Sequence, residues 1–253
     1  MERTCVEEKY FELLSKEWKD KAIWESIRDI ELTSAPCLVG SQFHDQSVKV
    51  MVVGRAVNGW EVEFDDCSSI EATTNSVLTQ KNRMDDFAAD WILDEHGKKY
   101  YYAKSPFLRM MRQLVGAFTG NEENWQQRLA WSNLFKIAPR NGGNPSWLMI
   151  RKDIPLYREI IKEEINQNKP NVVVFVTGMN FFDPYPNSKT YSSFLELINE
   201  VKLSSIPSEY ICMAGDFVDN PEIKLIVCKR PERRPIAEMV DAIADVYNEL
   251  KKR

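Results

Sequence analysis

The segment that most constrains the fold is 171–177, a nearly unbroken run of β-branched and aromatic residues that ends before Gly178. A short apolar run without polar alternation is typical of a parallel strand that is covered on both faces. Further strand-like runs occur at 48–53, 129–137 and 224–228. The sequence therefore predicts a sheet of mostly parallel strands.

Segments in which apolar residues recur at helical spacing separate these strands. They cover residues 5–32, 105–118, 154–168, 192–201 and 235–251, and a weaker pattern covers 83–93. Strands that alternate with helices predict one three-layer α/β/α domain with a small, mostly parallel central sheet. We expect residues 1–253 to form this single domain, with 1–47 as an N-terminal helical extension and 61–104 as an insertion or lid.

Composition narrows the class of protein further. The 253 residues are 43% hydrophobic, but they contain no apolar run long enough to span a membrane and no apolar leader at the N-terminus. The five cysteines are scattered and form no CxxC pair, which favours neither a disulfide framework nor a zinc site. We therefore expect a cytoplasmic protein without a membrane partner, a metal or another cofactor.

The charge distribution is uneven. The formal net charge is −5, which argues against a generally basic nucleic-acid binder, yet residues 98–158 carry 11 basic and only 3 acidic side chains. This basic segment is either a surface for phosphates or, equally well, part of a mixed surface after folding.

Common catalytic motifs are missing from the sequence. It contains no GxGxxG, GxxxxGK[ST], GxSxG or HExxH pattern, which disfavours the usual dinucleotide, P-loop, hydrolase and zinc-protease sites. The acidic pairs at 65–66 and 85–86 have no third ligand at a fixed spacing, so they make a weak cation site.

Polar side chains instead follow the predicted strands, where the carboxyl ends of parallel strands meet and ligands usually bind. Arg55 and Asn58 follow the first strand, and Arg140 and Asn144 follow the second. The last strand is followed by Lys229, Arg230 and Arg233. Their guanidinium groups suit bidentate contacts with phosphates or carbonyl oxygens.

The order of these segments resembles the uracil-DNA glycosylase superfamily. Residues 131–145 (WSNLFKIAPRNGGNP) resemble the family's strand and loop that carry its base-reading asparagine, and residues 48–59 are similar to its first motif. Ser105-Pro106-Phe107 resembles the segment whose aromatic ring stacks on the extruded base, and 171–178 is similar to the third strand. Arg230-Pro231 takes the place of the closing His-Pro motif.

This resemblance implies a small parallel sheet between helices and a base-flipping mechanism. Phe107 would stack on the base, Asn133 would hydrogen-bond its edge, and Asn58 would hold the attacking water. Arg230 would lie near the departing base. The remaining residues of the cluster would hold the DNA, and these are Arg55, Arg140, Asn144, Lys229 and Arg233.

The sequence also departs from the family. The loop after the first strand reads Gly54-Arg-Ala-Val-Asn58, so an arginine intrudes and the asparagine is displaced. Arg230 stands where the family has histidine, and a guanidinium can stabilise an anion but cannot exchange a proton near pH 7. Ala138 stands where some members have an iron–sulfur ligand cysteine, so no such cluster is expected.

Two functional hypotheses therefore stand beside each other. One is a glycosylase that excises uracil or another damaged base from DNA, and the other is an inactive module that binds a nucleobase, nucleotide or nucleic acid on the same fold. A third hypothesis is an unrelated small-molecule site at the same strand ends. Each residue also has a plainer interpretation, because Phe107 can be a core residue, Asn133 can satisfy backbone groups and Asn58-Gly59 can form a turn.

Overall fold

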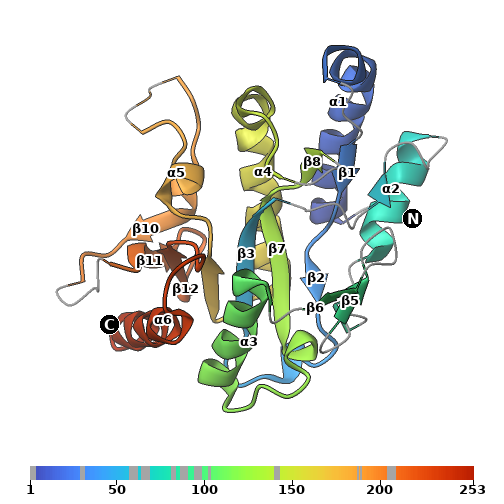
Figure 1. Cartoon of the computed structure of the whole chain (residues 1–253). Helices are drawn as coiled ribbons and strands as arrows, with labels where there is room; N and C mark the ends of the chain where they lie inside the picture. Colours follow the sequence, from blue (N-terminus) through green and yellow to red (C-terminus); the bar gives the residue numbers. More distant parts are fainter. Residues whose placement is uncertain are drawn as a thin grey trace.

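The computed structural model describes residues 4–28, 32–56, 62–63, 69–80, 84–85, 91–93, 99–101, 104–139, 143–186, 188, 190–203 and 209–253. At its centre lies a seven-stranded sheet (Figure 1). In spatial order its strands are β10 (Ile198–Glu200), β11 (Ile211–Phe217), β12 (Asn220–Cys228), β9 (Val172–Phe175), β3 (Val50–Ala56), β7 (Leu129–Phe135) and β2 (Leu38–Val39).

The four middle strands run parallel, which confirms the interpretation of their continuous apolar runs. Val53 of β3 is in register with Phe175 of β9 on one side and with Ser132 of β7 on the other. β12 extends this parallel set beyond β9, with Val227 opposite Phe175. Three further strands pair antiparallel, β11 and β10 at one edge and β2 at the other, so the sheet is larger than the small one predicted.

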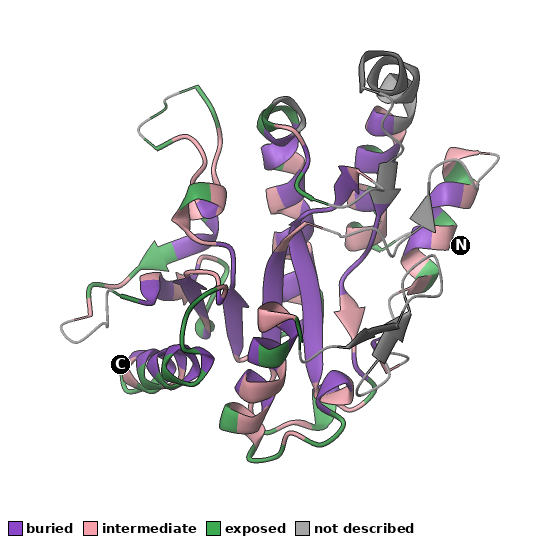
Figure 2. Cartoon of the chain, in the orientation of Figure 1, coloured by how far each residue is buried: buried purple, intermediate pink, exposed green. Residues whose placement is uncertain are grey.

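Each face of the sheet carries its own core, because successive side chains of a strand point to opposite faces. Met51 and Val53 of β3 pack with α1 (Cys5–Arg28), α2 (Ile70–Thr79) and α4 (Trp147–Asn168). Val50 and Val52 pack with α3 (Pro106–Thr119) and α6 (Ile236–Lys251). The buried strands between these helix layers are purple in Figure 2, and the result is the expected three-layer α/β architecture.

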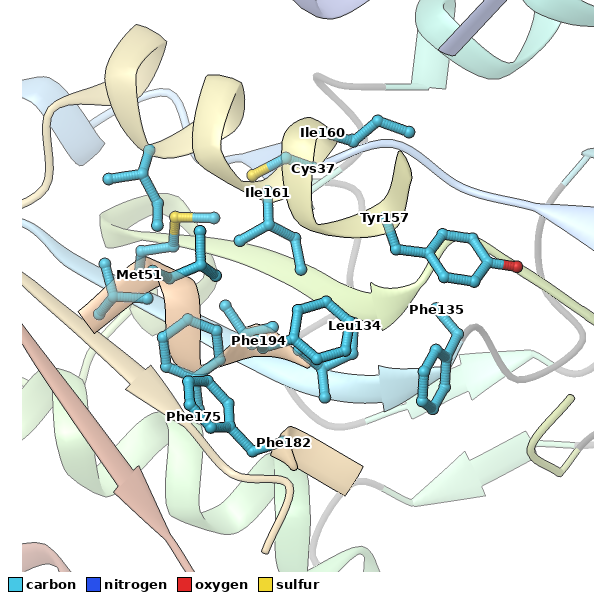
Figure 3. Close-up of a cluster of buried hydrophobic side chains, with 14 of the residues drawn as sticks. Cys37, Met51, Leu134, Phe135, Tyr157, Ile160, Ile161, Phe175, Phe182 and Phe194 are labelled. Atoms are coloured by element: carbon cyan, nitrogen blue, oxygen red, sulfur yellow. The ribbon is translucent and has the colours of Figure 1, made fainter. Parts of the chain in front are cut away.

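The larger core is rich in aromatic rings. Figure 3 shows Tyr157 and Ile161 of α4 on one side of this cluster and Leu134, Phe135 and Phe175 of the strands on the other. Phe135 contacts Tyr157 edge to face, with ring centroids 5.7 Å apart. This pair helps to fix the position of α4 against β7. No helix in the described ranges is long and apolar enough to cross a membrane.

Local chemistry explains why α3 begins where the sequence predicts. The Ser105 hydroxyl accepts a hydrogen bond from the Leu108 amide at 3.3 Å, and Pro106 occupies the first helical position. The helix ends at Gly120, whose φ of 75° is the left-handed conformation that glycine favours. The cap places Phe107 in the first turn of α3, facing the sheet.

Three predictions of helical structure are wrong. Residues 192–201 form a short 3-10 helix (Phe194–Leu197) followed by β10, and the pattern at 83–93 ends in β5 (Trp91–Leu93), which pairs with β6 (Lys99–Tyr101). The N-terminal 1–47 segment is not only helical, because β1 (Leu32–Ser34) and β2 follow α1. In each case the pairing with another strand overrides the local pattern.

The remaining short elements lie around these. β1 pairs with β4 (Val62–Glu63) and β8 (Ile137–Pro139) in a small second sheet, and α5 (Met179–Phe182) follows β9. Two more 3-10 helices are Phe43–Asp45 and Trp125–Arg128.

The segment 61–104 contributes directly to the core. Within it, α2 contacts α1 and buries Thr73, Thr74 and Val77 completely. This helix is therefore part of the domain's packing. The rest of the segment, which includes several residues outside the described ranges, keeps the interpretation of an insertion or lid as a prediction.

Candidate functional site

The carboxyl ends of the four parallel strands lie at one edge of the sheet. β3 occupies the switch point of the topology, because the chain continues from it to β7 on one side and later to β9 on the other. Open α/β sheets usually bind ligands at such a point, where the loops diverge. Gly54 and Arg55, near the carboxyl end of β3, are therefore the reference for the site.

Gly54 brings two predicted site residues together. A methyl group at Gly54 would lie 2.5 Å from Asn133 Oδ1 and 3.3 Å from Cζ of Phe107, so both side chains lie directly against this glycine. Asn133 is opposite Gly54 in the register of β3 and β7, and Phe107 enters from the first turn of α3. An aromatic ring and an amide thus converge at the switch point.

Both side chains are held in place by packing. Asn133 is only 9% exposed, and Phe107 is half-buried with its ring centroid 5.7 Å from that of Trp131. An amide has both a donor and an acceptor, so Asn133 can pair with the edge of a base that offers both. The two residues therefore place an aromatic ring and a polar amide next to each other at the carboxyl ends of the strands.

Arg55 lies at the same edge but packs on the other side of the sheet. Its Nε donates to the Thr177 carbonyl oxygen at 2.9 Å, and its guanidinium carbon lies 4.0 Å from the centroid of the Phe181 ring. Burial, together with repulsion from Arg230, lowers the pKa of Arg55 to about 10. The side chain therefore remains a fixed cation at neutral pH.

Arg230 is paired within the protein. Its Nε donates to both carboxylate oxygens of Glu232, at 2.8 and 3.0 Å, and Nη2 makes a further bond to the same group. Burial raises the pKa of Glu232, but the hydrogen bonds from Arg230 and the charge of Arg55 outweigh it and hold the pKa below its usual range. Glu232 thus offsets much of the charge that Arg230 was predicted to offer a departing base.

The other predicted DNA contacts are dispersed. Arg233 and Asn144 are exposed, and Lys229 is half-buried with its backbone amide bonded to the Tyr210 carbonyl oxygen at 2.9 Å. Asn58 and Arg140 lie outside the described residues, so their assigned roles stay predictions.

The basic segment 98–158 does not form one surface. Lys136 is fully buried, and its Nζ donates to Glu164 Oε2 at 2.7 Å and to the Ser132 hydroxyl. Glu164 Oε1 accepts bonds from the Tyr10 hydroxyl at 2.7 Å and the Cys37 amide at 3.2 Å. Because every oxygen of the carboxylate is satisfied, this buried network fixes β7 against α1 and α4.

The same network perturbs its neighbours. Burial, reinforced by the negative charge of Glu164, raises the pKa of Tyr10 well above its ordinary value and that of Cys37 likewise. Both groups therefore remain protonated at neutral pH. The network has a structural role next to the candidate site, because its hydrogen bonds join β7 to α1 and α4. Sequence reasoning missed it, because no local pattern identifies a lysine that becomes buried.

Comparison with protein-family models finds no match, and comparison with curated proteins finds none either. The function is therefore argued from the geometry. Among the described residues, no group of three His, Cys, Asp or Glu side chains is arranged to hold a metal ion.

A group of aromatic side chains beside Arg55 was also missed. Phe181 continues into Trp147, Tyr185 and Tyr191, each in contact with the next. Of these residues, Trp147 is 53% exposed. The signal in the sequence was a run of aromatic residues at 181–191 among proline, asparagine and serine, without helical or strand periodicity.

Proposed function

We propose that this chain recognises an unpaired uracil or damaged base in DNA, on an α/β fold of the uracil-DNA glycosylase type. The observation that carries the proposal is the convergence of Phe107 and Asn133 on Gly54 at the switch point of the sheet. The four parallel strands between two helix layers supply the framework that such a site needs.

In this proposal one nucleotide leaves the base stack and enters the site. The ring of Phe107 stacks on the base, and the amide of Asn133 pairs with its edge. Gly54 is needed because a side chain there would collide with the Asn133 amide and would press against the Phe107 ring. Arg55 supplies a positive charge at the same strand ends, while Lys229 and Arg233 are available to phosphates on the surface.

Excision of the base is a second candidate function, and the position of Arg55 favours it. Its charge is fixed by Thr177 and Phe181 at the strand ends, where it can stabilise an anionic leaving base. Arg230 is less suited to that role because Glu232 already binds it. Among the described residues, no imidazole lies at the carboxyl ends of these strands, and His44 is exposed in the 3-10 helix Phe43–Asp45. Binding of the base, without excision, is therefore the primary conclusion.

The test compares binding and base release in the same samples. Fluorescence anisotropy measures the affinity for oligonucleotides that contain one uracil or one thymine at the same position, and product analysis measures the released base. We expect wild type to prefer uracil, and Asn133→Ala to lose that preference. Asn199→Ala, which changes an exposed asparagine of β10, is the matched control.

Each outcome has a distinct meaning. A uracil preference that survives in Asn133→Ala would contradict the proposal. Base release by wild type that is lost in Arg55→Ala would establish the second candidate, whereas a uracil preference without release would leave the binding function alone.

A further inference from the structure

The exposed aromatic residues of the described chain are concentrated in one place. The two large hydrophobic side chains that are exposed there are Trp147 and Tyr191, at 53% and 40%. Single exposed hydrophobic residues are common on protein surfaces and need no explanation. These two, however, belong to one continuous group, because Tyr185 contacts both, with ring centroids 6.4 Å from Trp147 and 5.0 Å from Tyr191.

This group, which we call the aromatic platform, consists of Phe181, Trp147, Tyr185 and Tyr191. Trp147 stacks on Phe181 with an interplanar angle of 19° and centroids 5.6 Å apart. The hydroxyl of Tyr185 donates to the Trp147 carbonyl oxygen at 3.2 Å, which ties the loop after α5 to the start of α4. Figure 1 shows α5 and its following loop beside the upper end of α4.

A guanidinium group lies at each end of the platform. Arg55 contacts Phe181, and Arg151 lies 5.0 Å from the centroid of the Tyr191 ring and donates to its hydroxyl at 3.3 Å. One carboxyl group, Asp183, belongs to the same loop, and burial raises its pKa. The platform therefore combines exposed rings with two cations on a chain whose net charge is −5.

We propose that the aromatic platform binds single-stranded nucleic acid by stacking its unpaired bases on Trp147 and Tyr191. Proteins that bind single strands combine aromatic faces for the bases with cations for the backbone, because every base has a π-face while paired bases hide theirs. A purely apolar partner would gain nothing from the two guanidinium groups. Arg55 also connects the platform to the carboxyl end of β3.

The inference extends the proposed function by naming the form of nucleic acid that the site accepts, and it rests on that function for the choice of nucleic acid as partner. Its test is independent of base recognition, because stacking on the platform does not require a damaged base. Oligonucleotides without uracil therefore distinguish the two proposals.

The experiment measures anisotropy of a labelled 12-nucleotide strand without uracil and of its duplex, at two salt concentrations. We expect wild type to bind the single strand more tightly than the duplex. Trp147→Ala should weaken single-strand binding by about 10- to 100-fold, which lies within the range expected when a stacking aromatic residue is truncated. Tyr191→Ala should weaken it by about 5- to 10-fold, since Tyr191 is less exposed.

Two further variants separate stacking from other contacts. Trp147→Leu keeps an apolar side chain but no ring, so it should bind as weakly as Trp147→Ala, whereas Trp147→Phe should recover most of the affinity. Arg151→Ala should reduce both the affinity and the salt dependence, because a phosphate contact is lost. Arg253→Ala removes one charge at the exposed end of the chain and should change little.

The results that overturn the inference are also specific. Equal single-strand affinity of wild type, Trp147→Ala and Tyr191→Ala would overturn it, as would equal affinity for single strand and duplex. Self-association that Trp147→Leu preserves, without oligonucleotide binding, would mean that the platform contacts a second copy of the chain. A uracil preference lost in Asn133→Ala while Trp147→Ala binds normally would refute this inference and leave the proposed function intact.

Discussion

The two faces of β7 serve different purposes, although they are built from adjacent residues. Ser132 points to the face where Lys136 and Glu164 form a fully buried and fully bonded network. Asn133 points to the other face, where it lies against Gly54 at the edge of the sheet. One face of β7 thus fixes the position of the strand, while the other carries the polar group that the proposed function assigns to base recognition.

The largest expected effect comes from breaking the buried face. Glu164→Ala leaves the charge of Lys136 buried without its partner, which should lower the free energy of unfolding by about 3–5 kcal/mol. Urea denaturation measures the change. Glu159→Ala on the same helix is the control, because its side chain is 40% exposed beside Arg158 and should cost less than about 1 kcal/mol. Equal losses in both variants would refute the structural role of the network.

Removing both buried charges should lower the free energy of unfolding less than removing one of them. The double variant Lys136→Met with Glu164→Leu leaves no buried ion, so it should recover about 1–3 kcal/mol relative to Glu164→Ala. The hydroxyl groups of Ser132 and Tyr10 lose their acceptor, so recovery should be incomplete. A double-mutant cycle in urea checks this. Additive losses would mean that the two charges do not act as a pair.

The ligand-facing side is tested by Gly54→Ala. The added methyl group would lie 2.5 Å from Asn133 Oδ1, so the amide must move. We expect Gly54→Ala to lower the free energy of unfolding by about 1–2 kcal/mol through overpacking. We expect the uracil preference to fall by a larger fraction than the free energy of unfolding does. Anisotropy and urea denaturation of the same preparation separate the two effects. Reduced stability with an unchanged uracil preference would show that Asn133 does not read the base.

The smallest effect concerns the paired charges at the end of β12. The pKa of Glu232 is lower in the folded protein than the usual value of about 4.3, so its contribution is fully present above that pH and is lost as the pH falls through the folded pKa. Because the side chain is 43% exposed, solvent screening limits the contribution to a few tenths of a kcal/mol.

This contribution is measurable as a difference between two proteins. Wild type should lose slightly more stability than Glu232→Gln between pH 6 and pH 3, as followed by urea denaturation at each pH. Parallel curves would mean that Arg230 and Glu232 do not interact in solution.

Much of the framework could be predicted because the relevant signals are local. The continuous apolar run at 171–177 requires cover on both faces, and Ser105 with Pro106 marks the start of α3 by its own hydrogen bond and fixed φ. The strands β10 and β11 were not predicted. β10 is an edge strand in a segment whose pattern also fits a helix, and β11 is defined by its pairing with β10 and β12.

The sequence by itself determined the alternation of strands and helices, and it placed Asn133 and Phe107 at the ends of elements that later meet. Only the tertiary structure decided that both lie against Gly54, that Lys136 is buried rather than part of a basic surface, and that Trp147 is exposed rather than packed. The physical reason is that backbone geometry and apolar periodicity are properties of neighbouring residues. Burial, charge pairing and the convergence of side chains depend instead on contacts between segments that are far apart in the chain.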